Sequence, residues 1–206
     1  MNSRIIFTGI VIAVIIQRIL ELRISQRHAA KILAQGGQKH HDNFLPWVKG
    51  LQVSWFVVML LEVWLLNRPL VWGLAAIALL GTLAGQILRY LSMRALGWRW
   101  TLPIITLPGA GVVDTGIYRY LRHPNWLGVI LEILAVPLIH SAYLSAIVFS
   151  IANAFLLAKR VVAEEQALSL SDSHYQSLFA DRPRFLGLPT LSTFTVRNTS
   201  THHGSH

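Results

Sequence analysis

Two long stretches without a charged residue constrain this chain more than any other feature. Residues 70–88 form the first uncharged run and residues 142–158 form the second. A helix needs about 20 apolar residues to cross the hydrocarbon core of a bilayer. Strands fit poorly, because open sheet edges leave backbone groups unpaired in lipid and the runs lack the alternation of a membrane barrel. The two runs therefore predict membrane-spanning helices.

Three further apolar runs cover residues 5–22, 45–66 and 126–139, and the last of these is short and contains Glu132. The composition agrees, since 53% of the 206 residues are hydrophobic and only 13% are charged. That balance is too apolar for an ordinary soluble domain. We therefore expect an all-α polytopic membrane protein with about five transmembrane helices, built as one domain over residues 1–188.

The basic residues gather after the first, third and fifth apolar runs. They are Arg23, Arg27, Lys31 and Lys39; Arg89, Arg94, Arg99, Arg119 and Arg122; and Lys159, Arg160, Arg182 and Arg184. The formal net charge is +9, but the basic residues form neither one continuous stripe nor a helix of the kind that reads DNA. Nucleic acid is therefore not predicted as a partner. The positive-inside rule instead predicts an outer N-terminus and a cytoplasmic C-terminus.

Two segments do not read as spanning helices. Residues 96–118 contain several glycines and prolines, which argue against one continuous helix and predict a structured loop. Residues 189–206 are rich in Ser, Thr and His without apolar periodicity, and we predict that this tail is disordered. The chain has no cysteine, so thiol chemistry is not available to it, and its histidines show no convincing metal-ligand spacing.

Two polar motifs stand next to the last two apolar runs. Residues 118–128 read Tyr-x-x-x-Arg-His-Pro-x-aromatic-x-Gly, and Arg160, Glu164 and Glu165 follow after one predicted helical hairpin. Arg160 and Glu164 are four residues apart, so they share one helix face. Both motifs also have a structural interpretation: the first as a helix cap, and the second as an ordinary ion pair worth about 0.2–0.5 kcal/mol, with Glu165 a solvated neighbour.

Taken together, the two motifs resemble the isoprenylcysteine carboxyl methyltransferase family, which comprises integral membrane enzymes that use S-adenosylmethionine. The likeness covers residues 96–188, which we take as the catalytic core. Residues 17–22 look like a bacterial branch of the family found beside polyketide synthases that make alkylpyrones or alkylresorcinols. The resemblance implies an enzyme of the bacterial cytoplasmic membrane, and the positive-inside pattern predicts that its active site faces the cytoplasm. We expect a monomer.

The activity implied by the resemblance is S-adenosylmethionine-dependent O-methylation of a lipophilic or prenylated acceptor taken from the bilayer. The acceptor group stays open between an isoprenylcysteine-type carboxylate and an alkylpyrone or alkylresorcinol hydroxyl. A phospholipid N-methyltransferase, a nicotinamide-dependent membrane reductase with a similar Arg-His-Pro-Asn turn, and a noncatalytic scaffold are the alternatives.

The site residues are carried over from the resembled family position by position. The positions that contact the cofactor are Ala110, Gly111, Val112, Val113, Tyr118, His123, Pro124, Asn125, Trp126 and Glu164. Arg160 matches the position that holds the acceptor, so Arg160 and Glu164 are the predicted catalytic pair. Trp126 departs from the more usual tyrosine, and it lacks the phenol hydroxyl. The cofactor's sulfonium and ammonium groups independently require anionic or dipolar partners near a membrane.

Several polar or small residues within the apolar runs call for a structural explanation. For Glu62 we expect a structural ion pair, whereas Glu132 stays open between pairing and a substrate passage. Gly81 and Gly85 fit close helix packing within the monomer. Residues 182–185, Arg-Pro-Arg-Phe, are expected to dock the C-terminal segment onto the domain.

Overall fold

The structure, a computed structural model, describes residues 2–185, so the tail predicted over residues 189–206 lies outside the described residues. The helices are α1 (Asn2–Ala34), α2 (Leu45–Leu65), α3 (Trp72–Leu96), α4 (Pro124–Leu138), α5 (Tyr143–Ser171) and the short α6 (Tyr175–Phe179). Two short 3-10 helices cover Gly97–Arg99 and Gly116–Arg119, and two-residue strands β1 (Gln38–Lys39) and β2 (Ile105–Thr106) pair antiparallel. The prediction of an all-α membrane protein is confirmed.

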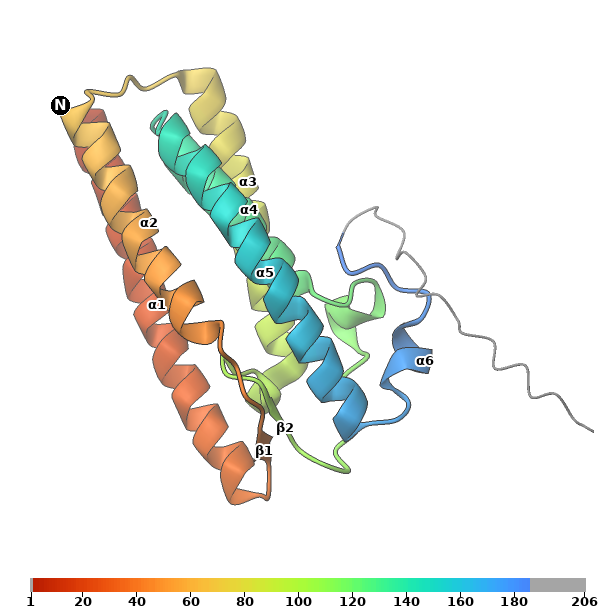
Figure 1. The fold of residues 1–206 in the computed structure, drawn as a ribbon. Helices are drawn as coiled ribbons and strands as arrows, with labels where there is room; N and C mark the ends of the chain where they lie inside the picture. The colour runs from red at the N-terminus through yellow and green to blue at the C-terminus, as the bar shows by residue number, and fades with distance from the viewer. Residues whose placement is uncertain (1, 186–206) are drawn as a thin grey trace, which may run out of the picture.

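Four of the described helices, α1, α2, α3 and α5, are long and apolar enough to cross a membrane. The remaining predicted helix, α4, which corresponds to the fourth apolar run, has 15 residues and is therefore about 22 Å long, shorter than the roughly 30 Å of a hydrocarbon core. It lies between α3 and α5, and its C-terminal turn lies toward the end of the bundle where α3 begins (Figure 1). The first turn of α4 consequently starts part-way along its longer neighbours.

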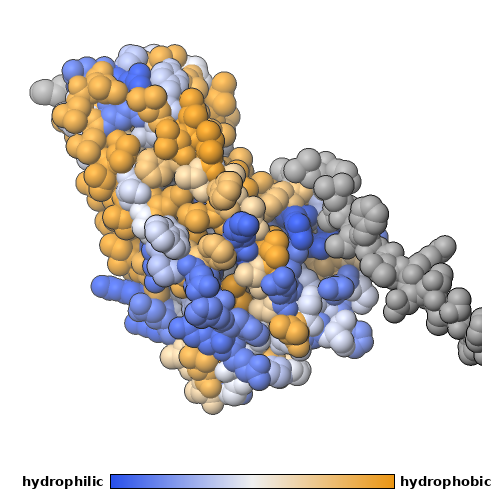
Figure 2. Space-filling view, in the orientation of Figure 1, coloured by the Kyte–Doolittle hydropathy of each residue, from blue (hydrophilic) through white to orange (hydrophobic). Residues whose placement is uncertain are grey.

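The outer surface of the bundle carries the apolar side chains of an integral membrane protein. Ile12, Ile77 and Phe155 are exposed examples from α1, α3 and α5. Figure 2 shows hydrophobic residues over the upper part of the bundle and a band of hydrophilic residues across the lower part, near β1 and α6. A contiguous apolar exterior of this size fits lipid contact rather than water.

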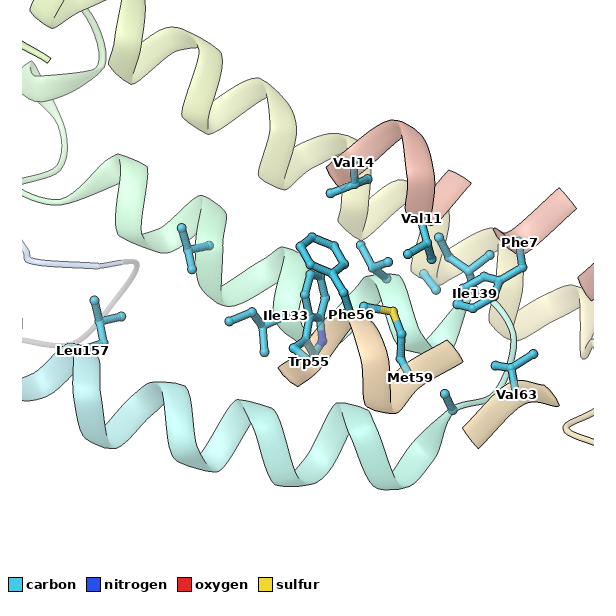
Figure 3. Close-up of a cluster of buried hydrophobic side chains, with 14 of the residues drawn as sticks. Phe7, Val11, Val14, Trp55, Phe56, Met59, Val63, Ile133, Ile139 and Leu157 are labelled. Carbon is cyan, nitrogen blue, oxygen red and sulfur yellow. The ribbon is translucent and has the colours of Figure 1, made fainter. Parts of the chain in front are cut away.

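The core joins α1, α2 and α4 through large side chains. Phe7 and Val11 of α1, Trp55 and Met59 of α2 and Ile133 of α4 are almost completely buried and form one cluster (Figure 3). Phe7 and Val11 are four residues apart, as are Trp55 and Met59, so each pair lies on one face of its helix. Lipid tails are as apolar as these side chains, so removal from water contributes little to this contact. The contact is stabilised by the close packing of the side chains.

Helices α3 and α4 approach most closely at two glycines. A Cβ atom on Gly85 would lie 2.9 Å from the carbonyl oxygen of Gly128, and one on Gly128 would lie 2.7 Å from that of Gly85. On Gly81 it would meet the Ala135 side chain at 3.2 Å. The predicted close packing of Gly81 and Gly85 within the monomer is therefore confirmed.

A cluster of four buried charges ties α1, α3 and α4 together. Arg18 Nη1 lies 2.6 Å from Glu21 Oε2 in α1, and Arg89 Nε of α3 lies 3.7 Å from Glu132 Oε1 of α4. Arg18 also pairs with Glu132, and Arg89 with Glu21. The formal charges cancel, which is how charged groups are tolerated away from water. Glu132 is thus a paired structural residue in this fold.

Glu62, near the end of α2, holds the beginning of α5. Its carboxylate accepts hydrogen bonds from the Ser145 backbone N–H at 2.7 Å, from the Ser145 hydroxyl at 2.7 Å and from the Leu144 N–H at 3.1 Å. A carboxylate suits the positive end of a helix dipole. Arg68 completes the arrangement with an Nε donor at 3.0 Å. The predicted structural pairing of Glu62 is confirmed, with Arg68 as the partner.

Candidate functional site

A cavity lies at the hydrophilic end of the bundle, between the loop after α3, the first turn of α4 and the last turns of α5. Its empty volume, including the solvent at its mouth, is about 1290 Å³. The predicted site residues that line it are Ala110, Gly111, Val112, Val113, Tyr118, His123, Asn125, Trp126, Arg160 and Glu164. Pro124 is the one predicted residue outside this lining, and it is fully buried in the first turn of α4. The structure therefore brings the two sequence motifs together around one space.

The proline-containing turn orients the first turn of α4. Pro124 is the first residue of the helix, where its fixed φ suits helical geometry and its missing N–H is not needed. The preceding His123 makes no side-chain cap hydrogen bond. Asn125 and Trp126 follow and line the cavity. The uncapped, positive end of the α4 dipole thus lies at the cavity wall.

The loop after α3 forms the opposite wall, and it is irregular as predicted. Gly97 ends α3 with a φ of +54°, and Gly111 has a φ of +66°, backbone conformations that favour glycine. The pairing of β2 with β1 anchors this loop, with Gln38 opposite Thr106. A two-residue strand pair thereby connects the loop to the segment between α1 and α2.

Glu164 carries a negative charge into the cavity without a cationic partner. Its Oε2 accepts a hydrogen bond from the indole Nε1 of Trp126 at 2.8 Å. Within the described residues, no ion pair includes Glu164. A partly buried carboxylate in this state favours a positively charged ligand.

Arg160 is paired with Asp42 and not with Glu164, so the ordinary i, i+4 ion pair is not what the structure shows. Its Nη1 binds the Asp42 carboxylate and its Nη2 donates to the main-chain oxygen of Leu102. Its Nε is buried and has no partner among the described residues. The guanidinium carbon lies 5.1 Å from the Trp126 ring centroid, in cation–π range. Sequence reasoning missed Asp42, which is 118 residues away in the chain.

Glu165 is an anchor rather than the solvated neighbour of the structural interpretation. Its Oε1 lies 3.0 Å from His123 Nε2 and accepts a bond from Arg184 Nε at 2.9 Å. Arg184 Nη2 adds a second contact to Oε2 at 2.5 Å. The hydrogen bond to Glu165 raises the pKa of the Arg184 guanidinium, so this pair stays charged over the physiological range. His123 is therefore held by a carboxylate, which a plain helix cap does not require.

The C-terminal segment closes over the same turn, as the sequence predicted for residues 182–185. The backbone N–H of Arg122 donates to Pro183 at 3.0 Å, and that of His123 donates to Arg184 at 3.2 Å. Arg182 Nη1 reaches the carbonyl oxygen of Tyr118 at 2.9 Å. These bonds dock the segment against the first turn of α4, and they add to the clamp that Glu165 forms on His123.

The negative charges at the acidic end of α5 affect the pKa of two buried tyrosines. Burial raises the pKa of Tyr118, and the charge of Glu164 raises it further. Burial likewise raises the pKa of Tyr175, followed by the charges of Glu165 and Glu164. Both phenols remain neutral, and both line the cavity.

The residues present fit a ligand with positive charge and aromatic surface. Besides Glu164, the side-chain oxygen Oδ1 of Asn125 is buried and has no partner among the described residues, so it is free to accept a bond from an amino or ammonium group. The rings of Tyr118 and Trp126 can stack on a nucleobase or face a cation. The start of α4 suits a carboxylate. S-adenosylmethionine combines these features. Within residues 2–185 no group of His, Cys, Asp and Glu has the arrangement of a metal site.

Fold and cavity together define a polytopic helical membrane protein with a polar site at one end of its bundle. The chain belongs to the isoprenylcysteine carboxyl methyltransferase (ICMT) family, whose sequence profile matches residues 75–170. The matched segment runs from α3 into α5 and includes the His123 turn, Arg160 and Glu164. The family places the chain among membrane methyltransferases.

Two relatives share most of the chain's length. The protein YpbQ of Bacillus subtilis is 35% identical over 163 residues, which covers 79% of this chain and 96% of YpbQ. A protein of Haemophilus influenzae is 25% identical over 166 residues, covering 80% of this chain and 96% of the relative. The name of neither relative states an activity.

Proposed function

We propose that this protein is an S-adenosylmethionine-dependent O-methyltransferase of the bacterial cytoplasmic membrane that acts on a lipophilic acceptor. The observation that carries the proposal is the single cavity shared by the His123 turn and the last turns of α5. Family membership supports methyl transfer, and the composition of the cavity wall supports a cationic cofactor. The positive-inside pattern supports a cavity that faces the cytoplasm.

Glu164 and Asn125 are the residues we assign to the positive groups of the cofactor. Glu164 has no competing cation within the described residues, and Asn125 Oδ1 is a buried acceptor without a partner. The start of α4 is assigned to the cofactor carboxylate, because free backbone N–H groups lie there. When bound, the cofactor supplies an electrophilic methyl group on a sulfonium.

Arg160 is assigned to the acceptor. It is buried, it lines the cavity, and its Nε has no partner among the described residues. A fixed donor at this position holds the acceptor oxygen and stabilises negative charge that develops on it. Holding two reactants at contact distance is worth up to about 7–11 kcal/mol of the barrier. A lipophilic acceptor would enter from the bilayer, which the exposed apolar side chains of the spanning helices contact.

The test is methyl transfer from labelled S-adenosylmethionine by membranes that contain the protein. The acceptors compared are farnesylcysteine analogues, which offer a carboxylate, and alkylpyrones and alkylresorcinols, which offer a hydroxyl. We expect Arg160→Ala to abolish transfer with cofactor affinity retained, and Glu164→Gln to weaken cofactor binding. Asp181→Asn, an exposed carboxylate outside the cavity lining, is the matched control. Equal and mild effects of the two site variants would reduce Arg160 and Glu164 to structural residues.

A further inference from the structure

We infer that Asp172 recognises the ribose of the cofactor by accepting hydrogen bonds from the two sugar hydroxyls. The inference rests on the proposed function and adds to it a residue that selects the nucleoside. Asp172 directly follows the last residue of α5, and it lies two positions beyond the segment that matches the family profile. Neither sequence motif includes it. Its role therefore comes from the structure of this chain.

One face of α5 lines the cavity over its last turns. The residues of this face follow one another at intervals of four, and all of them line the cavity: Arg160, Glu164, Leu168 and Asp172. From Glu164 to Asp172 the helix rises about 12 Å. The face therefore presents a guanidinium, a carboxylate, an apolar side chain and a second carboxylate in that order.

One carboxylate oxygen of Asp172 is occupied and the other is not. Its Oδ1 accepts a hydrogen bond from the backbone N–H of His174 at 2.8 Å, and the Nδ1 of that ring lies 3.4 Å from the same oxygen. Within residues 2–185, Oδ2 accepts no hydrogen bond and takes part in no ion pair. The side chain is 20% exposed, so a ligand can reach it from solvent. A carboxylate oxygen can accept from two donors.

The opposite wall leaves space beside this oxygen. The loop after β2 passes the end of α5 (Figure 1). A Cβ atom on Gly111 would lie 4.0 Å from Asp172 Oδ2, so a longer side chain at this position would extend toward the carboxylate. Arg99 Nη1 holds the loop by donating to the Gly111 carbonyl oxygen at 2.9 Å. A glycine facing a free carboxylate across a cavity permits the close approach of a ligand.

The order of groups on α5 matches the order of groups in S-adenosylmethionine. The sulfonium links the amino acid part of the cofactor to the C5′ atom of the ribose. Glu164 is assigned to the positive groups and Arg160, on one side of it, to the acceptor. The nucleoside is then the part left for Leu168 and Asp172 on the other side. Its hydrogen-bond donors are the two ribose hydroxyls and the adenine amino group, and a carboxylate accepts from such donors.

The burial of the cavity wall favours the ribose over the adenine as the partner of Asp172. Trp100 and Tyr118 line the cavity and are only 3% and 9% exposed, so their rings offer apolar faces to a base. Asp172 is more exposed, which suits hydroxyls that stay partly hydrated. An acidic residue that accepts a bond from a ribose hydroxyl is also how dinucleotide sites recognise this sugar.

The experiment measures binding of three ligands to the purified full chain in lipid nanodiscs by equilibrium dialysis. They are S-adenosylhomocysteine, its 2′,3′-dideoxy analogue and S-inosylhomocysteine, which lacks the adenine amino group. We expect the wild type to bind S-adenosylhomocysteine at least about tenfold more tightly than the dideoxy analogue. In Asp172→Ser this preference should fall by at least about fivefold. The preference over S-inosylhomocysteine should stay within about twofold of the wild-type value.

Serine can keep the bond to the His174 N–H, and it has no second oxygen to replace Oδ2. Asp181→Ser is the matched control, because Asp181 is exposed and does not line the cavity; it should keep the full preference. A wild-type preference below about tenfold overturns the inference, and so does a fall of less than about fivefold in Asp172→Ser. A loss that follows S-inosylhomocysteine instead assigns Asp172 to the adenine and also overturns it.

If Asp172→Ser does not fold, Asp172→Asn decides by the same two criteria, since asparagine keeps the turn and removes the charge. Binding of S-adenosylhomocysteine by the wild type separates the two levels of the proposal. Binding without a preference for the hydroxyls refutes only the role of Asp172. Absence of binding refutes the proposed function and the inference with it.

Discussion

Replacing Glu132 with glutamine should destabilise the bundle more than any other conservative change to a carboxylate. Glu132 is 1% exposed and bridges Arg18 of α1 and Arg89 of α3. Glutamine keeps the shape and removes the charge, so two buried guanidinium groups then share the single carboxylate of Glu21. Breaking a buried pair by removing one partner costs about 3–5 kcal/mol. We expect a loss of that size in the free energy of unfolding.

The assay is reversible unfolding of the purified protein in bicelles, followed by circular dichroism. The double variant Arg18→Met/Glu132→Met removes one charge of each sign and leaves the pair between Arg89 and Glu21. Because apolar replacement of a complete buried pair is often neutral or stabilising, it should recover most of the loss. Asp181→Asn should change stability by less than about 0.5 kcal/mol. A Glu132→Gln variant within about 1 kcal/mol of wild type, or a double variant less stable than the single one, contradicts the electrostatic explanation.

Two further predictions test the packing and the clamp on the site. Gly128→Ala should cost about 1–3 kcal/mol in the same unfolding assay, because its Cβ would meet the Gly85 carbonyl oxygen at 2.7 Å; Gly50→Ala, which meets nothing within 4 Å, is the control, and equal effects would argue against the close contact. Glu165→Gln should weaken cofactor binding about tenfold by releasing His123, measured by equilibrium dialysis, since a hydrogen bond to a charged group is worth about 1.5–3 kcal/mol. In a protein that already carries His123→Ala, adding Glu165→Gln should cause little further loss of cofactor affinity. If the losses of the two single variants add up in the double variant, the two residues act separately.

The sequence predicted the elements that a local pattern determines. The uncharged run at residues 70–88 became the spanning helix α3, and the glycines and prolines after it became the irregular loop. The i, i+4 spacing placed Arg160 and Glu164 on the same wall of the cavity. The run at residues 126–139 was expected to be short, and α4 has 15 residues; the sequence does not show that its first turn begins within the bundle.

Contacts between distant segments could not be read from the sequence. Asp42, which pairs with Arg160, follows β1, and a strand of two residues leaves almost no pattern in the sequence. Glu165 looked like a solvated neighbour because its partner Arg184 comes from a segment that folds back over the His123 turn. The one available signal for Asp42 was its place just before an apolar run, which indicates a helix cap but not a partner on α5.

The most direct test of the central claim is calorimetric titration of the purified protein in lipid nanodiscs with S-adenosylmethionine. The claim is that the cavity between the His123 turn and α5 holds a cationic cofactor through Glu164. We predict saturable binding at one site per chain and affinity at least about tenfold lower in Glu164→Gln. No heat of binding up to millimolar cofactor, or unchanged affinity in Glu164→Gln, would contradict the account.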